Sequence, residues 1–499
     1  MTDAFIPLLV AVPLLGALLA VASGLVSERG PPAVAGGILA VQTALAVWIG
    51  SRAVLNGPLS NAVGGFVAPY GIELVVDGLS AVVVVLVAVV SLAILVYTVR
   101  DDPGGTAFYT EYLLLVTGLS GMSVTGDVFN LYVFLEISGL ATYALVASAG
   151  DGPSAVAALK YLLFGTVAAS LYLLGVGYAL VATGTLNMAD LSVELARAGY
   201  DSTLVLASFG FIVVGLATKT ALFPLHTWQP DAYNDAPDSV SALIAALVST
   251  VAAYALLRIA YTVYTPAFFE AVPVARDALV TFACVSIVVG SVLAVAQSEV
   301  KRMLAYSSVS QYGLVVVGLA IGTRAAIFGA VVHLVGHAIM KGGLFVAAGT
   351  VDDLIGATTV DEYAGLADRF PVLGGASAAL MLAMVGVPPA VGFAGKWYIA
   401  LGAVRAGTWP VAVVIFASTL LTLAYFAILV ERMFVAPASA SVQAATDGGA
   451  ADRERGRPTA PPRGVLALIV GAAVVALLLG IAVTDLQTAL QPTLDTLLS

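Results

Sequence analysis

The stretch ATKTALFPLHTWQPDAY, residues 217–233, places a lysine and two prolines inside a long apolar run. A proline removes a backbone donor and clashes with the preceding turn, so this run predicts a helix that breaks after Lys219. In a bilayer the freed carbonyls need partners, and broken helices therefore occur where they line a cavity. The stretch AMVGVPPAVGFAGKWYIA (383–400) repeats the pattern, with Lys396 after its glycines and prolines. Two such breaks, five predicted helices apart, are typical of an internally repeated transporter.

The composition places the chain in a membrane. Its 499 residues are 60% hydrophobic and 10% charged, whereas soluble domains have about 25% charged residues. Cys284 is the single cysteine, which excludes a disulfide framework, a cysteine-ligated zinc site and an iron–sulfur cluster held by this chain. The net charge of −10 argues against nucleic-acid binding. We expect an all-α polytopic membrane protein, surrounded by the lipid bilayer, without a cofactor or a metal ion.

Charged residues divide the chain into apolar runs of about 20 residues, the length that crosses a bilayer. They predict about fourteen transmembrane helices, of which helices 7 and 12 are broken. Helices 4–8 and 9–13 form two five-helix repeats, and because five is odd their topology is inverted. The predicted spans are 4–27, 30–51, 78–99, 110–126, 127–149, 160–183, 203–232, 239–262, 278–298, 303–323, 325–350, 371–403, 409–431 and 464–484.

The same boundaries predict five parts of the chain. Three N-terminal helices precede two repeats, and a flexible basic linker separates the second repeat from the last helix. The parts are residues 1–105 (helices 1–3), 106–265 (first repeat), 276–433 (second repeat), 434–463 (linker) and 464–499 (helix 14 and the C-terminal tail).

The distribution of lysine and arginine predicts the orientation. Eleven of these residues flank the helices on the side opposite the termini, and six flank them on the side of the termini. By the positive-inside rule both termini then lie outside the cytoplasm. The first apolar segment has no basic n-region, so we expect it to be a retained helix of a multi-pass cell-membrane protein.

Buried lysines are the strongest functional signal. The chain has five lysines, and three of them, Lys219, Lys341 and Lys396, fall within predicted membrane helices. An ionised group at the centre of such a helix costs about 2.5–3.5 kcal/mol, so it needs a partner or a function. Lysine, unlike arginine, can release its proton when it is buried. The alternative is a structural role through interhelical ion pairs or snorkelling.

A carboxylate and three histidines accompany these lysines. Glu136 stands in the middle of a run without other charges, residues 128–150. His333, His337 and Lys341 are spaced i, i+4, i+8 and so lie on one helix face, where protons can be relayed in steps. Zinc binding is disfavoured because no glutamate follows His333 and because the lysine would repel a cation. Hydrogen-bonded core histidines remain an alternative. The third histidine, at position 226, lies within the first break.

Several motifs carry a family resemblance. TGDVFNLYVFLEISGLATYAL, TKTALFPLHTWQPDAYNDAPDSVSAL, EVKRMLAYSSVSQYG and HLVGHAIMKGGLF resemble the antiporter-like membrane subunits of Mrp-type cation/proton antiporters, respiratory complex I and membrane-bound hydrogenases. The resemblance covers about residues 70–435. VAPYGIELVVDGLSA and TGTLNMADLSVELA resemble the D-type component of Mrp antiporters most closely, and the M and N types of complex I are near relatives.

The resemblance implies a hydrated polar axis across the middle of the membrane. In this family a glutamate on helix 5 pairs with a lysine on helix 7, and these residues match Glu136 and Lys219. The family's lysine on broken helix 12 matches Lys396, and its helix 11 histidine and lysine match His337 and Lys341.

Two positions qualify the resemblance. His226 matches a loop histidine that is common in the M type of complex I and variable among the D-type components of Mrp antiporters. Thr250 stands where many relatives carry a lysine on helix 8. Three interpretations of this gap remain open: water and Thr250 bridge it, the two histidines of helix 11 take a larger share, or coupling is weaker.

We therefore expect the proton-translocating subunit of a multisubunit Na⁺ (cation)/H⁺ antiporter, with other membrane subunits, protons and Na⁺ as partners. Weakening the pair of Glu136 and Lys219 would send the proton of the lysine along the axis. The alternatives are the proton-pumping subunit of a complex I-like or hydrogenase-like redox complex, and a structural scaffold. The expected route uses Glu136, Lys219, His333, His337, Lys341 and Lys396, with His226 and Thr250 as auxiliary residues.

Overall fold

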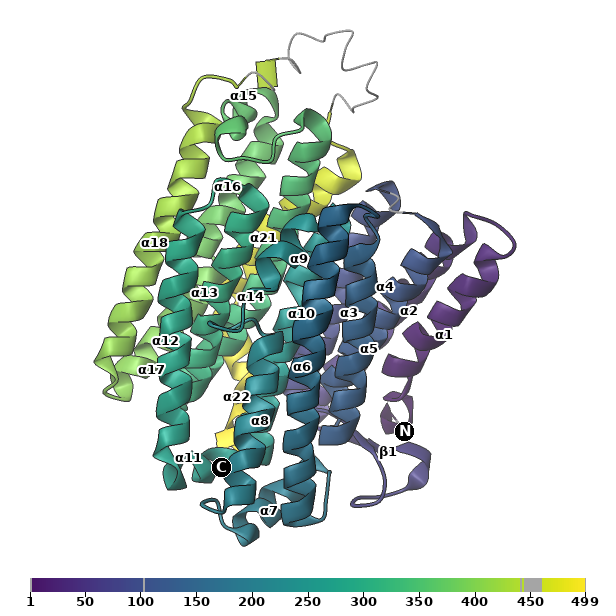
Figure 1. Cartoon of the computed structure of the whole chain (residues 1–499), viewed down its shortest axis with the longest axis vertical. Coiled ribbons are helices and arrows are strands. Elements are labelled where there is room, and N and C mark those ends of the chain that lie inside the picture. The colour runs from purple at the N-terminus through teal and green to yellow at the C-terminus, as the bar shows by residue number, and fades with distance from the viewer. Residues whose placement is uncertain (1, 102–103, 440–441, 444–459, 499) are drawn as a thin grey trace.

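The computed structural model describes residues 2–101, 104–439, 442–443 and 460–498. Long helices run along the longest axis of the molecule, and both termini lie at the same end, hereafter the termini end (Figure 1). This arrangement agrees with an even number of membrane crossings. Most of the predicted linker, residues 434–463, lies outside the described residues.

The N-terminal part contains three long helices and a hairpin that the sequence did not predict. The hairpin joins the second and third helices at the termini end, and its two strands are antiparallel. Its elements are η1 (Thr2–Phe5), α1 (Leu8–Gly24), α2 (Gly30–Asn56), β1 (Leu59–Ala62), η2 (Val63–Gly65), β2 (Glu73–Val76) and α3 (Gly78–Asp101).

The first predicted repeat contains a broken helix, formed by α8 and α9, and an additional amphipathic helix, α7. The α10 helix continues into a π-helical turn, η3. The elements are α4 (Gly105–Val124), α5 (Val128–Ala147), α6 (Gly152–Thr183), α7 (Met188–Ala198), α8 (Thr203–Lys219), α9 (Gln229–Asp235), α10 (Asp238–Arg258) and η3 (Ile259–Val263).

The second predicted repeat follows the short helix α11 (Thr265–Ala271), and α16 and α17 form its broken helix. Two further helices, α21 (Arg463–Ile481) and α22 (Val483–Leu498), end the described chain. The repeat consists of α12 (Pro273–Val295), α13 (Val300–Ile321), α14 (Arg324–Ile355), η4 (Asp361–Tyr363), α15 (Leu366–Arg369), α16 (Pro371–Val385), α17 (Val391–Arg405) and α18 (Trp409–Phe434).

The helices agree with the predicted spans. Within the described residues, eleven helices are long and apolar enough to cross a membrane. The first halves of the two broken helices, α8 and α16, are shorter apolar helices. Together with α4, these two broken helices supply the remaining predicted spans. The chain is a multi-pass, all-α membrane protein.

Two isolated backbone bridges relate the two repeats. Asp127, just before α5, pairs with Asn187, just after α6, while Glu299, before α13, pairs with Thr359, after α14. The partners are 60 residues apart in both bridges, and equivalent backbone hydrogen bonds flank them. The helix α7 that follows the first bridge lies at the termini end, and α15, after the second, lies at the opposite end (Figure 1). The repeats are therefore inverted.

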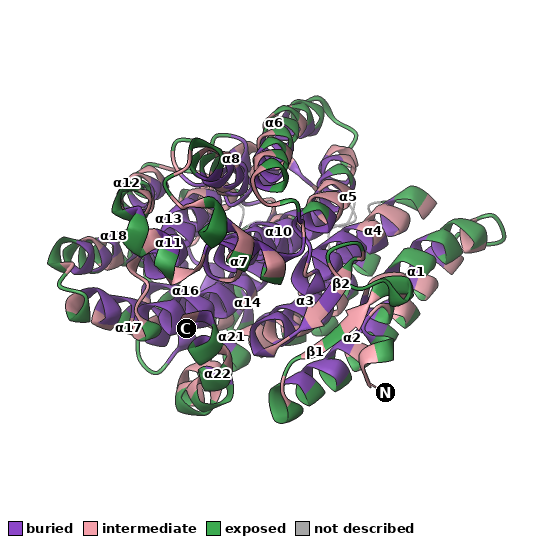
Figure 2. Cartoon of the chain, turned by 90° about the horizontal axis from the view of Figure 1, so that it is seen from below, coloured by how far each residue is buried: buried purple, intermediate pink, exposed green. Residues whose placement is uncertain are grey.

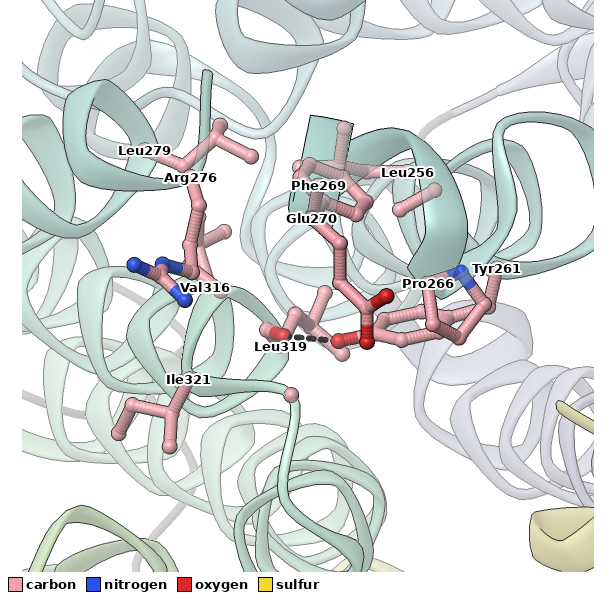
Figure 3. Close-up of a pocket in the computed structure, with 13 residues that line it drawn as sticks. Leu256, Tyr261, Pro266, Phe269, Glu270, Arg276, Leu279, Val316, Leu319 and Ile321 are labelled. Atoms are coloured by element: carbon pink, nitrogen blue, oxygen red, sulfur yellow. Dashed lines mark hydrogen bonds between the residues drawn. The ribbon is translucent and has the colours of Figure 1, made fainter. Parts of the chain in front are cut away.

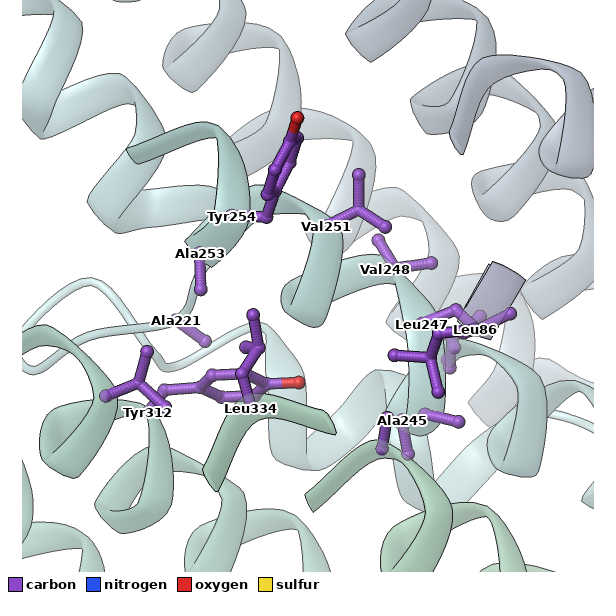
Figure 4. Close-up of a cluster of buried hydrophobic side chains, with 14 of the residues drawn as sticks. Leu86, Ala221, Ala245, Leu247, Val248, Val251, Ala253, Tyr254, Tyr312 and Leu334 are labelled. Carbon is purple, nitrogen blue, oxygen red and sulfur yellow. The ribbon is translucent and has the colours of Figure 1, made fainter. Parts of the chain in front are cut away.

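The centre of the molecule consists of α10, α13 and α14. The apolar window of α10 is buried on all sides, and those of α13 and α14 are almost fully buried. Figure 2 shows these helices surrounded by others, whereas α1, α2 and α18 expose one face. Small and branched apolar residues surround α10, and Tyr254 and Tyr312 lie among them (Figure 4). A helix that is apolar all round is expected to be buried.

Glycines let α14 and α17 approach to backbone contact. A Cβ added at Gly329 would lie 2.6 Å from the backbone N of Ile399, and one at Gly395 would lie 2.9 Å from the backbone N of His333. Membrane helices commonly pack through small residues in this way. The contact places the histidine helix directly against the start of α17.

The Gly395→Ala variant is expected to destabilise the protein. Its methyl group would meet backbone atoms that cannot move aside, and such overpacking costs about 1–3 kcal/mol. Thermal unfolding of the purified protein should show a lower midpoint. Gly375→Ala on α16 is the matched control, because an added Cβ there has no atom within 4 Å. Equal midpoints for the two variants would contradict the close contact.

Candidate functional site

The first helix break is closed by side chains from elsewhere in the chain. The α8 helix ends at Lys219, and the chain continues through an irregular segment before α9 begins. The indole N–H of Trp228 donates to the carbonyl of Thr218 at 3.0 Å, and the Ser249 hydroxyl donates to the carbonyl of Lys219 at 3.3 Å. These carbonyls therefore have the protein partners that the sequence led us to expect.

The Lys219 ammonium is bound by a tyrosine. Lys219 is 5% exposed, and its Nζ donates to the Tyr143 hydroxyl at 2.8 Å. Gly139, one turn earlier on α5, makes room for the ammonium, because an added Cβ there would lie 3.0 Å from Nζ. The position of Lys219 is thus set by two residues of α5.

The predicted direct pair between Glu136 and Lys219 is not formed. Among the described residues, no ion pair within 4 Å joins them, although Glu136 is near enough for its charge to attract that of the lysine. Tyr143 lies seven residues after Glu136, on the same face of α5, and its longer side chain reaches the ammonium instead. The residue of α5 that contacts the Lys219 ammonium is therefore Tyr143 and not Glu136.

An aromatic row that the sequence did not predict supports this tyrosine. The ring of Tyr143 packs edge-to-face on that of Tyr161, with centroids 4.8 Å apart, and Tyr161 stacks on Trp228 at 4.0 Å. The row joins α5 and α6 to the break after α8. One feature of the sequence could have predicted this tyrosine. It shares a helix face with Glu136, and a tyrosine buried in an apolar helix needs a partner for its hydroxyl.

Buried polar groups continue from α9 onto α10. The amide of Gln229 donates to the hydroxyls of Tyr233 at 3.1 Å and Ser249 at 3.3 Å. All three side chains are almost completely buried. Since Ser249 also bonds the backbone of Lys219, this cluster joins the first break to the central helix.

Thr250 joins the two repeats. Its hydroxyl lies 2.9 Å from that of Tyr312 on α13, and the ring of Tyr312 packs against that of His337 on α14, with centroids 4.7 Å apart. The position that lacks the lysine of many relatives therefore reaches the second repeat through a tyrosine. The interpretation in which water and Thr250 bridge the gap stays a prediction.

The α14 helix brings together three of the predicted residues. His333, His337 and Lys341 are fully buried on one face, as their spacing predicted. The Nε2 atom of His333 bonds the amide oxygen of Gln311 at 2.8 Å, and Lys341 donates to the Leu304 carbonyl and the Ser307 hydroxyl. Neither ring nitrogen of His337 has a hydrogen-bond partner among the described residues. The alternative of hydrogen-bonded core histidines thus fits His333 and not His337.

Lys396 bonds across the break that precedes it. Its Nζ donates to the carbonyls of Met384 and Val385, both at 3.0 Å. These carbonyls end α16, and the glycine that follows, Gly386, has a left-handed backbone (φ 98°). A lysine before one break and a lysine after the other therefore both stand where the backbone is interrupted.

His226 lies apart from the buried polar side chains that extend from the first helix break to the second. Its ring neighbours are Phe223 and Tyr306, at 5.4 and 6.1 Å between centroids. Nearby, at the end opposite the termini, Asp231 pairs with Lys160 at 2.6 Å and with Arg302 at 3.2 Å. His226 is therefore placed beside a charged cluster rather than between the membrane lysines.

No group of three or more histidine, cysteine, aspartate or glutamate side chains that would hold a metal ion is found in the part of the chain that the structure describes. The buried polar side chains between the two helix breaks instead present single ammonium, imidazole, amide and hydroxyl groups. Hydroxyl and neutral imidazole groups can both donate and accept a hydrogen bond. Such groups can pass a proton from one to the next when they lie within hydrogen-bond distance.

Comparison with known proteins identifies the family. Residues 125–440 match the family model described as NADH:quinone oxidoreductase/Mrp antiporter, transmembrane region. The chain belongs to this family. The N-type subunit of the NADH-quinone oxidoreductase of Desulforudis audaxviator is 45% identical over 437 residues, which cover 86% of each chain. The D-type subunit of the Na⁺/H⁺ antiporter of Bacillus subtilis is 33% identical over 371 residues, or 74% of each chain.

Solved structures agree with this assignment. The membrane-bound sulfane sulfur reductase, an archaeal respiratory membrane complex, matches with a TM-score of 0.89 at 29% identity and covers 99% of this chain and 98% of its own. The Mrp complex of Dietzia sp. DQ12-45-1b has a TM-score of 0.86 at 25% identity, covering 100% and 99%. Complex I of Thermus thermophilus has 0.76 at 28%, covering 95% and 97%. All three of these solved structures are multisubunit complexes.

The bond between Tyr143 and Lys219 can be measured by a double-mutant cycle. Hydrogen bonds to charged groups contribute about 1.5–3 kcal/mol, so Tyr143→Phe and Lys219→Met should show a coupling energy in that range. Denaturant unfolding of the four proteins gives this value. Tyr178→Phe, whose ring stacks on Phe211, is the control and should be additive with the lysine variant. Additivity of the first pair would contradict the contact.

Proposed function

We propose that this chain is the proton-translocating membrane subunit of a multisubunit cation/proton antiporter, with Na⁺ as the exchanged cation. The observation that carries the proposal is the row of buried polar side chains between the two helix breaks. The family membership and the similarity to the D-type subunit of a Na⁺/H⁺ antiporter support it.

In this mechanism Glu136 controls how firmly Lys219 holds its proton. Two unit charges about 8 Å apart interact by about 2 kcal/mol at an effective dielectric constant of about 20. A change of that size alters the proton occupancy of a lysine more than tenfold, since about 1.4 kcal/mol corresponds to a factor of ten. A shift of Lys219 away from the carboxylate favours release of the proton, and a return favours uptake. Tyr143 holds the lysine in one of these two positions.

The released proton moves from the first repeat to the second. We propose that it passes Thr250 and Tyr312 to reach His337, and from there Lys341 and Lys396. The hydroxyl contact at 2.9 Å and the packing of Tyr312 on His337 support this order. The membrane potential supplies about 2.3 kcal/mol per charge for each 100 mV, which can drive the exchange. His333 contributes through Gln311, and His226 remains an auxiliary residue.

We further propose the orientation and the division of the chain. The termini end faces away from the cytoplasm, across the plasma membrane, and the charged cluster of Lys160, Asp231 and Arg302 faces the cytoplasm. The two repeats are residues 106–265 and 276–433, and the paired bridges at opposite ends of the molecule support this division.

A redox complex is the second candidate. The 45% identity to an N-type subunit of NADH-quinone oxidoreductase specifically favours it, as does the similarity to an archaeal respiratory complex. The same proton row would serve either assembly, with redox chemistry held in other subunits. Purification of the intact complex from native membranes, followed by identification of its subunits, separates the two. Small membrane partners without redox centres support the antiporter, and quinone-binding and iron–sulfur subunits support the redox complex.

The first functional test removes either the carboxylate of Glu136 or the ammonium of Lys219. Glu136→Ala or Lys219→Ala should abolish proton exchange, because the lysine loses either its controlling charge or its proton-carrying group. Exchange is measured as cation-dependent proton flux in membrane vesicles, and assembly is measured by recovery of the complex. Glu194→Ala is the control, because this residue forms a surface ion pair with Arg197 on α7. Full flux in either test variant refutes the mechanism.

The link between the repeats provides an independent test. Tyr312→Phe removes the hydroxyl that contacts Thr250 but keeps the ring on His337, so proton flux should fall about tenfold while assembly persists. Tyr178→Phe again serves as the control. Unchanged flux in Tyr312→Phe would show that protons do not use this contact.

A further inference from the structure

A cavity with several polar side chains in its wall opens at the termini end, apart from the buried polar side chains between the two helix breaks. It has a volume of about 450 Å³ and is lined by the hairpin, the start of α3, α7, η3 and α22. In its wall Glu73 accepts a hydrogen bond from Asn187 at 3.3 Å, and the hydroxyl oxygen of Thr262 is buried without a partner among the described residues. We call this cavity the termini-end vestibule.

A buried ion pair lies at the boundary of the vestibule. Arg258 and Asp77 both line it, and their side chains are 2.6 Å apart and only 10% and 14% exposed. The Asp77 carboxylate also accepts hydrogen bonds from the backbone N–H groups of Leu79 and Ser80 at the start of α3. The pair thus fastens the last residue of α10 to the first turn of α3.

One face of α10 leads from this ion pair to the proposed proton row. Thr250, Tyr254 and Arg258 are spaced four residues apart, so they follow one helix face over about 12 Å. The Arg258 Nε–H donates to the Tyr254 hydroxyl at 2.9 Å, and this hydroxyl donates to the Ser123 carbonyl at 2.7 Å. Apolar side chains such as Val248 and Val251 lie on other faces of this helix (Figure 4).

A second cavity lies on the other side of η3 and provides a comparison. It measures about 150 Å³, and like the vestibule it has a mostly apolar wall (Figure 3). Tyr261 lines both cavities, while Glu270 and Arg276 stand at the smaller one. Arg276 pairs with its sequence neighbour Asp277 near the surface. Only the larger cavity therefore adjoins a buried ion pair that continues into the polar face of α10.

We propose that the termini-end vestibule is the outer mouth of the proton row and that the Arg258–Asp77 ion pair is its gate. Arginine keeps its proton at all physiological pH values, so its charge is a fixed barrier to protons and metal cations that arrive from the vestibule. The gate prevents a leak while the row is open to the other side, and separation of the pair connects α10 to the vestibule. The inference rests on the proposed proton translocation.

The first test asks whether the vestibule is open to the outer solution. In the assembled complex with Cys284→Ser, a cysteine is introduced as Thr262→Cys, and a membrane-impermeant cationic thiosulfonate is added from outside. Thr262→Cys should react at least tenfold faster than Ala253→Cys, a control in the apolar cluster of the same helix. Equal rates, or reaction only from the cytoplasmic side, would overturn the assignment as an outer mouth.

The second test opens the gate. The double variant Arg258→Gln with Asp77→Asn removes both charges, and passive proton leak driven by a membrane potential should rise at least tenfold in vesicles that contain the complex. Arg258→Lys keeps the positive charge and should keep the leak low. Arg276→Gln is the control at the smaller cavity and should leave the leak unchanged. A double variant that assembles without a raised leak would overturn the gate.

The two tests separate this inference from the proposed function. If Lys219→Ala abolishes exchange but the gate variants do not leak, translocation stands and the gate fails. If Lys219→Ala retains full exchange, the proposed function fails while the labelling of Thr262→Cys still reports on the vestibule. Should the double variant fail to assemble, the labelling rates alone decide whether the outer mouth exists.

Discussion

The structure depends on one constraint, that a polar backbone group inside a membrane needs a partner. Two helices are interrupted within their membrane spans, and at both interruptions side chains supply the missing hydrogen bonds. At the first break the donors are Trp228 and Ser249, and at the second the donor is Lys396 itself. At the second break the residue that closes the break, Lys396, is also one of the titratable groups of the candidate site. There a single side chain both satisfies the free carbonyls and places an ammonium group inside the molecule.

Much of the fold was predictable because each helix that crosses a membrane needs a run of about 20 apolar residues. The spacing of charged residues gave the helices, and the prolines and glycines near Lys219 and Lys396 located both breaks. The hairpin and α7 were not predicted, since they lie at the termini end, where hydropathy no longer selects one structure. The turn η3 falls almost entirely within the predicted span 239–262, and only its π-helical form was not predicted. The inverted repeat followed from the number of helices between the breaks and is visible in the two matched bridges.

The candidate site was predicted less completely, and the reason is chemical. Charged residues stand out in an apolar chain, so Glu136, Lys219 and Lys396 were identified directly. Tyrosine counts as partly apolar, so Tyr312 gives no signal and Tyr143 gives one only through its spacing from Glu136. Both tyrosines nevertheless make the contacts that join Lys219 and Thr250 to neighbouring helices. Partners on other helices also depend on packing, which no single stretch of sequence contains. The proposed roles of these residues remain open to the experiments described above.

The matched bridges have a mechanical consequence. Among the described residues, the matched bridge of each repeat lies at one end of the molecule: that of Asp127 with Asn187 lies at the termini end, and that of Glu299 with Thr359 lies at the opposite end. A neighbouring protein that presses on one end of the molecule therefore acts on the end of one repeat that carries the bridge. In the other repeat it acts on the end that is opposite the bridge. The same force can stiffen one half while it deforms its counterpart, so a symmetric fold responds asymmetrically to its surroundings.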